Sequence, residues 1–158
     1  MKNIIENLSK INFNKEVSKD KTRYLVLIIW EILCIIVTFY IQEFLRPQKL
    51  QLSTFGYFLQ GTLPSFFGAA GWYVLFFIFH KIYQSTKNEY RLTHSIIFAF
   101  AMTFGGLTLW EFMRMVIRPF DLYDVIMTFL GCAVSTIFIL ILYFKDLKII
   151  NNEKKHCR

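Results

Sequence analysis

The residues of this chain that could do chemistry lie mostly in one short stretch, 109–125, between its last two apolar segments. Within it Glu111, Arg114 and Arg118 are spaced by three and four residues, so a helix places them on one face, where they can pair. Arginines in such a cluster are suited to phosphate, and carboxylates are suited to acid–base chemistry or to a hard cation.

The next two acids, Asp121 and Asp124, have a structural explanation and a chemical one. Asp121 follows Pro119 and precedes an apolar helix, where an N-cap residue stands, and Asp124 falls in the first turn, where negative charge suits the helix dipole. The chemical alternative makes them acid, base or metal ligands of a membrane hydrolase or transferase. Two acids without a histidine at the same depth form a thin site, so we expect no catalytic residue, metal or cofactor.

Composition indicates where these residues are held. The chain has 158 residues, of which 55% are hydrophobic and 18% aromatic, which is more apolar surface than one small soluble core can bury. Its uninterrupted apolar runs are about 20 residues long, as membrane-spanning helices require. We therefore predict an all-α, single-domain membrane protein with an antiparallel bundle of four transmembrane helices, at about 24–45, 63–83, 93–117 and 122–144. The connection 48–61 is expected to be an aromatic loop at the membrane interface.

The basic residues predict the orientation. If both termini are cytoplasmic, 14 of the 18 lysines and arginines lie inside, as the positive-inside rule requires for a plasma-membrane protein. The basic tail 1–22 then lies inside as a surface helix or a solvated tail, and the basic tail 145–158 lies inside as well. The net charge of +7 thus needs no nucleic-acid partner, and membrane lipids, including anionic headgroups, are the expected partners.

This orientation gathers one set of charges near the outer surface, which we call the outer cluster. Its members are Glu43, Arg46, Glu111, Arg114, Arg118, Asp121 and Asp124. One interpretation is that the arginines bind a phosphate- or amide-bearing envelope component or precursor. The other is that the acids and bases satisfy one another, since the outer surface is neutral in sum once Lys49 is counted.

Glu31 is unusual because it lies within the first predicted span, where an unpaired carboxylate is costly. It is either protonated or hydrogen-bonded to a neighbouring helix, or it is the proton-coupling group of a small transporter or exporter. A further alternative is a structural subunit of a larger membrane complex, because the many phenylalanines exceed the interior positions of four spans.

Small residues predict where helices pack closely. They occur at 68–71 in the second span, at Ala101, Gly105 and Gly106 in the third, and at Gly131 and Ser135 in the fourth. Such faces would also permit a homo-oligomer.

These motifs resemble the VanZ-like family of small bacterial integral membrane proteins. The resemblance rests on Glu111, on the step from Arg118 through Asp121 to Asp124, and on Gly131, with 63–66 similar to the family's second segment. It covers about 46–142. One position departs, because Thr128 stands where members commonly have asparagine.

The resemblance implies an envelope-facing membrane protein. In some bacteria the family is associated with resistance to teicoplanin-type glycopeptides, by a mechanism that is not established. It therefore implies a location and a context rather than a reaction.

Overall fold

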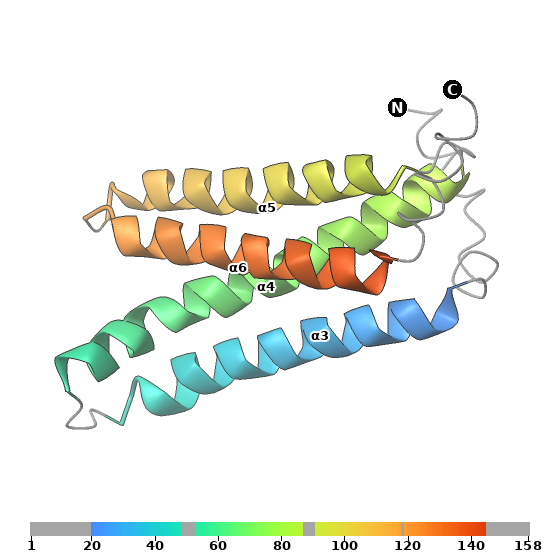
Figure 1. The fold of residues 1–158 in the computed structure, drawn as a ribbon. Helices are drawn as coiled ribbons and strands as arrows, with labels where there is room; N and C mark the ends of the chain where they lie inside the picture. The colour runs from blue at the N-terminus through green and yellow to red at the C-terminus, as the bar shows by residue number, and fades with distance from the viewer. Residues whose placement is uncertain (1–19, 49–52, 87–90, 118, 145–158) are drawn as a thin grey trace.

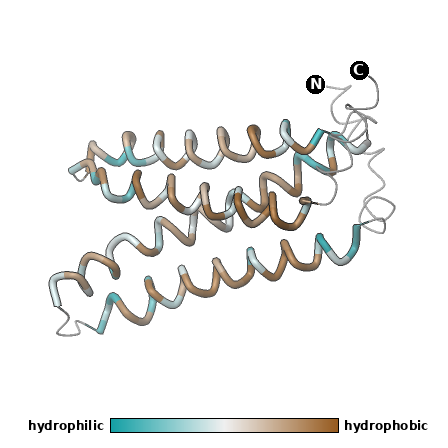
Figure 2. Tube along the Cα trace, in the orientation of Figure 1, coloured by the Kyte–Doolittle hydropathy of each residue, from teal (hydrophilic) through white to brown (hydrophobic). Residues whose placement is uncertain are grey.

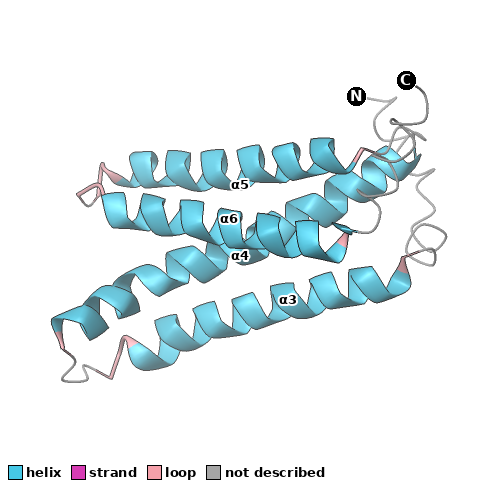
Figure 3. Ribbon diagram, in the orientation of Figure 1, coloured by secondary structure: helices cyan, strands magenta, loops and turns pink. Residues whose placement is uncertain are grey.

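The computed structural model describes residues 20–48, 53–86, 91–117 and 119–144, which form four long helices (Figure 1). Their bounds are α3 Lys21–Tyr40, continued by the π-helical turn η1 Ile41–Leu45, then α4 Thr54–Thr86, α5 Leu92–Arg114 and α6 Leu122–Leu142. These described ranges contain no strand, as Figure 3 shows. The predicted all-α class is therefore confirmed.

All four helices are long and apolar enough to cross a membrane. Large apolar side chains point outward along their lengths, among them Leu33, Ile36, Trp72, Ile97 and Ile137. In Figure 2 the hydrophobic colour covers the middle of the helices, while the hydrophilic colour gathers toward their ends. This distribution suits lipid around the middle and water at the ends, and it indicates a multi-pass membrane protein.

Helix α4 organises the packing because it contacts each of the other three helices, and α5 also contacts α6 (Figure 1). Its fully buried residues form the centre of the apolar core: Ala69, Ala70, Tyr73, Val74 and Phe77. Tyr73 is anchored at both sides, since its hydroxyl donates to the Ile96 carbonyl oxygen at 3.2 Å and accepts from Thr136 Oγ1 at 2.8 Å.

Small residues bring α4 and α6 into close contact, and the small residues predicted as packing positions on the second and fourth spans lie at this contact or beside it. A Cβ added to Gly131 would overlap the carbonyl oxygen of Phe66, and Ser135 Oγ donates to the carbonyl oxygen of Ala70 at 3.1 Å. On the other side of α4, a Cβ on Gly71 would lie 3.4 Å from Cys34 Cβ of α3. Gly131 thus permits a close backbone approach of α6 to α4, whereas an added Cβ at Gly71 would make an ordinary contact with α3.

Within the described residues, no helix packs closely against the small-residue face predicted on the third span. Ala101, Gly105 and Gly106 are exposed, and a Cβ on either glycine would meet no atom within 4 Å. Helix α5 instead buries a face that includes Ala99 and Thr103. Small side chains permit close packing but do not attract a partner by themselves.

The second helix begins nine residues earlier than predicted, so most of the expected interfacial loop is helical. Ser53 caps the helix: its hydroxyl oxygen accepts from the Gly56 N–H at 3.3 Å, and its carbonyl oxygen accepts from Tyr57 N at 3.0 Å. Pro64 therefore lies inside α4, not at its start. Residues 49–52 of the predicted loop lie outside the described residues.

The other boundaries differ by a few residues. Helix α5 ends at Arg114, because the Met115 N–H bonds to the Phe112 carbonyl oxygen, an i to i−3 contact that tightens the last turn. Helix α6 ends at Leu142. The predicted surface helix or solvated tail at 1–22 and the tail at 145–158 fall almost entirely outside the described residues.

Candidate functional site

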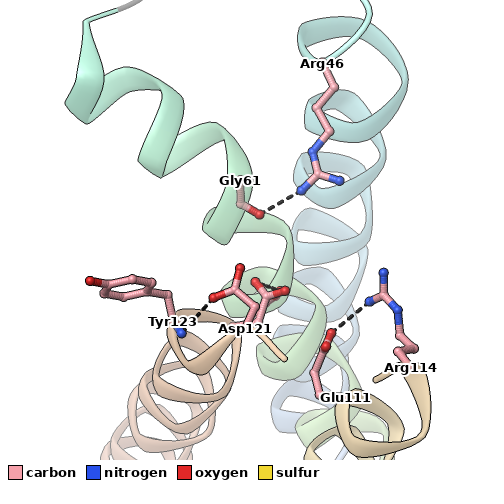
Figure 4. Close-up of polar contacts among 8 residues, drawn as sticks. Arg46, Gly61, Glu111, Arg114, Asp121 and Tyr123 are labelled. Atoms are coloured by element: carbon pink, nitrogen blue, oxygen red, sulfur yellow. Dashed lines mark hydrogen bonds and ion pairs between the residues drawn. The ribbon is translucent and has the colours of Figure 1, made fainter. Parts of the chain in front are cut away.

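A polar cavity of about 480 Å³ lies where η1, the first half of α4, the end of α5 and the start of α6 meet. We call it the polar cavity. Its lining residues are Gln42, Arg46, Gly61, Pro64, Ser65, Gly68, Ala69, Leu107, Trp110, Glu111, Arg114, Asp121, Asp124 and Thr128. Figure 4 shows Arg46, Glu111, Arg114 and Asp121 of this wall, brought together from the end of η1, the last turn of α5 and the turn before α6. Its volume is that of a small-molecule site.

Arg46 is held by the backbone of α4. Pro64 has no N–H, so the carbonyl oxygen of Gln60 lacks the donor that a regular helix would supply. Arg46 Nε donates to that oxygen at 3.3 Å, and Nη2 donates to the carbonyl oxygen of Gly61 at 2.7 Å (Figure 4). In the opposite direction, the Gln60 side-chain amide donates to the Leu45 carbonyl oxygen. The proline thus creates the acceptor that fixes the guanidinium at the cavity.

Glu111 and Arg114 form an ion pair on the last turn of α5. Arg114 Nη1 lies 2.8 Å from Glu111 Oε1, which confirms the pairing predicted from their spacing. The carboxylate is buried, with 7% of the residue exposed, whereas about a third of the arginine side chain is exposed. The acid therefore lies deeper than its partner.

The two aspartates are placed by the start of α6. Asp121 is its N-cap, as predicted, and its side chain accepts from the Tyr123 N–H at 2.9 Å. Asp124 lies in the first turn, is 7% exposed, and accepts a hydrogen bond from Ser65 Oγ of α4 at 2.7 Å. Asp124 thus does more than complement the helix dipole, because it also ties α6 to α4.

The structure brings together five of the seven residues predicted for the outer cluster. Glu43 is exposed and does not line the polar cavity, and Arg118 lies outside the described residues. Sequence reasoning missed Ser65 and Trp110 as lining residues. Thr128, noted because it departs from the VanZ-like pattern, is buried in the cavity wall one turn after Asp124.

Glu31 lies apart from this cluster, in a second hollow of about 300 Å³ between α3 and α4. We call it the α3–α4 groove. It is lined by Glu31, Ile35, Thr38, Phe39, Gln42, Phe67, Gly68, Gly71, Trp72 and Leu75. Gln42 and Gly68 line both hollows, so the groove adjoins the polar cavity.

A polar cluster that the sequence does not predict surrounds the buried Lys81 at the opposite end of α4. Lys81 is 4% exposed, and its Nζ lies 2.8 Å from Asp20 Oδ2 and 2.6 Å from the Tyr143 hydroxyl. The same ammonium makes cation–π contacts with the rings of Tyr24 and Tyr143, at 4.7 and 4.3 Å from their centroids. This group joins α3, α4 and the end of α6.

No set of three or more histidine, cysteine, aspartate or glutamate side chains within the described ranges could hold a metal ion. Cys34 and Cys132 are buried free thiols on different helices. The polar cavity is lined by charged and hydrogen-bonding side chains, among them Arg46, Glu111 and Asp121.

In comparisons with known proteins, no protein-family model matches the chain, and no curated protein or solved structure matches it.

Proposed function

We propose that this chain is a plasma-membrane protein that binds a phosphate-bearing envelope component in the polar cavity, at the outer surface. The observation that carries the proposal is the position of Arg46 and the contacts that it makes. Its guanidinium lines the cavity and is held by two backbone carbonyl oxygens, and within the described part of the chain it makes no ion pair. A phosphate would supply the missing counter-charge through the remaining N–H donors.

A second group of the cavity suits the other end of such a ligand. Asp121 lines the same cavity, and its one hydrogen bond in the described structure is the cap to the Tyr123 N–H. Its carboxylate can accept from an ammonium or a hydroxyl of the ligand. Arg46 and Asp121 line the same cavity and form no ion pair with each other, so a ligand that carries both a phosphate and an amine would find an opposite charge for each group.

The proposed topology has antiparallel consecutive helices and both termini in the cytoplasm. Contacts support the antiparallel arrangement of α3 and α4, because Arg46 meets Gly61 whereas Asp20 meets Lys81. The excess of lysine and arginine near the Lys81 end supports a cytoplasmic position for that end. The polar cavity then opens at the outer surface.

Membership of the VanZ-like family belongs to this proposal. It is supported by the location of the residues that carry the resemblance: Glu111, Asp121 and Asp124 line one cavity. Gly131 allows the close contact of α6 with α4 that supports the cavity wall. An outer-surface site for an envelope component agrees with the context which that family implies.

The test uses Trp110 as a reporter, because it lines the polar cavity, in protein whose other two tryptophans, Trp30 and Trp72, are replaced by phenylalanine. Purified protein is titrated with glycerophosphoethanolamine, a soluble molecule with a phosphate and an amine, while tryptophan fluorescence is recorded. We expect saturable binding that Arg46→Ala weakens by about tenfold or more, the loss of one or more charge-assisted hydrogen bonds. Glu43→Gln, an exposed neighbour outside the cavity, should bind as the wild type does. Binding unchanged by Arg46→Ala would refute the proposal.

A second candidate function is proton-coupled transport through Glu31. It is favoured by one observation, that this acid lines a groove which adjoins the polar cavity. Glu31→Gln should then abolish the proton-dependent transport of the substrate into vesicles. The binding of glycerophosphoethanolamine in the polar cavity should stay intact. Flux with the same proton dependence in that variant would eliminate this candidate.

A further inference from the structure

The α3–α4 groove and the polar cavity differ in character although they adjoin. Apart from Glu31, Thr38 and Gln42, the groove is lined by apolar side chains and glycines. Several of the apolar ones are exposed on the outside of the bundle, among them Ile35, Phe39 and Trp72. The groove therefore opens sideways, where the spanning helices face lipid.

The direction of the groove follows from its residues. It runs from Gln42 of η1, at the junction, back along α3 to Glu31, and on α4 from Gly68 to Leu75. Gln42 lies eleven positions after Glu31, which is about 16 Å at helical rise. That length is about half of the ~30 Å hydrocarbon layer, the depth of one leaflet. The polar side chain of Glu31 thus lies at the deep end.

We propose that the ligand of this protein is a phospholipid, whose headgroup occupies the polar cavity and one of whose acyl chains occupies the α3–α4 groove. The inference rests on the proposed function for its headgroup half. A polar cavity that continues into an apolar, laterally open groove of one leaflet's depth matches the shape of a lipid. A soluble ligand would use the cavity alone. The headgroup class is a phosphate with an amine, as in phosphatidylethanolamine, because Arg46 and Asp121 line the cavity.

A substitution at Gly68 can test the binding of the acyl chain separately from that of the headgroup. It lines both hollows, and a Cβ added to it would meet no atom within 4 Å. A leucine at this position would therefore project into open space at the junction and obstruct the passage of an acyl chain. Gly105 is the control, since an added Cβ there also meets no atom within 4 Å, while Gly105 is exposed and lines neither hollow.

The experiment places the full chain in vesicles of phosphatidylethanolamine and phosphatidylglycerol, with a small fraction of phosphatidylethanolamine that carries a photoreactive diazirine in one acyl chain. After illumination, the crosslinked positions are mapped by mass spectrometry. We expect crosslinks to Phe39, Trp72 and Leu75 at about fivefold or more the yield at Met102 and Leu109, which are exposed on α5 and line neither the groove nor the polar cavity. Gly68→Leu should reduce the groove yield to the level of α5, and Gly105→Leu should leave it unchanged.

A second variant keeps the test valid if Gly68→Leu fails to fold. Thr38→Phe fills the groove from α3 and leaves the polar cavity unchanged, because Thr38 lines the groove but not the polar cavity. It should lower the groove crosslinks in the same way. The titration of Trp110 with glycerophosphoethanolamine is run on each variant and should remain close to that of the wild type in Thr38→Phe.

The outcomes distinguish the inference from the function on which it rests. Equal crosslinking of all lipid-exposed positions, with normal headgroup titration, overturns the acyl-chain site and leaves the proposed function standing. Failure of wild-type protein to bind the soluble headgroup overturns the proposed function. Groove crosslinks that Gly68→Leu and Thr38→Phe both leave unchanged also overturn the inference.

Discussion

Arg46 Nη2 lies 2.7 Å from the carbonyl oxygen of Gly61, so a side chain from η1 supplies a donor in the interior of α4. Together with the bond from Nε to Gln60, this contact compensates for Pro64, which cannot donate. One guanidinium therefore supports a proline-containing helix and also presents charge to the polar cavity.

Replacing Arg46 by lysine tests the first role. Lysine keeps the charge but has no planar fork, so it cannot serve both carbonyl oxygens in the same way. We expect Arg46→Lys to lower the free energy of unfolding by about 1 kcal/mol, the net value of one lost hydrogen bond. Thermal unfolding in mild detergent measures this. Glu43→Gln is the control, and an equal loss in both variants would contradict the account.

Gly131 is the position where an added side chain should cost most. A Cβ there overlaps the carbonyl oxygen of Phe66, so Gly131→Ala must push α6 away from α4. We expect a loss of about 1–3 kcal/mol, typical of overpacking, measured as a lower unfolding temperature. Gly105→Ala should have little effect, because nothing lies within 4 Å of its added Cβ. The idea fails if the two variants unfold alike.

The two roles of Asp121 can be separated by two substitutions. Asparagine can still cap α6 by accepting from the Tyr123 N–H, but it lacks the negative charge. We predict that Asp121→Asn unfolds at nearly the wild-type temperature and binds glycerophosphoethanolamine more weakly than the wild type does. Asp121→Ala should in addition lose about 0.5–2 kcal/mol of stability, the cost of a removed cap. Unchanged headgroup affinity in Asp121→Asn would show that the charge takes no part in binding.

The Lys81 group at the other end should contribute stability rather than binding. Tyr143→Phe removes the hydroxyl that accepts from Lys81 Nζ but keeps the ring under the ammonium. We expect a loss of about 1 kcal/mol in unfolding, with headgroup binding unchanged. Tyr123→Phe on the exposed start of α6 serves as the control and should be neutral. Weaker headgroup binding in Tyr143→Phe would contradict a purely structural role.

Much of the fold can be predicted from the sequence because lipid imposes long apolar helices, and three of the four spans lie within a few residues of their predicted bounds. The start of α4 could not be found in this way. Gly56, Gly61 and Pro64 are typical of a loop, and the helix tolerates the proline through Arg46, a contact across 14 residues that no local pattern reveals.

The charged residues of the candidate site could be predicted from the sequence, but the contacts between helices that complete the site could not. Helical spacing predicts that Glu111 pairs with Arg114, and chain position predicts that Asp121 caps α6. The bond from Ser65 to Asp124 joins residues 59 apart, and it depends on the packing of α4 against α6. In the same way, Lys81 is one of several basic residues near a predicted turn, and nothing local shows that it is buried.

The most direct test of the central claim is native mass spectrometry of the protein extracted in mild detergent from membranes that contain phosphatidylethanolamine. We predict that the wild type and Glu43→Gln each retain about one phosphatidylethanolamine per chain, and that Arg46→Ala loses most of it while remaining folded. If Arg46→Ala retains as much of this lipid as the wild type does, the polar cavity does not bind its headgroup through Arg46, and the account is wrong.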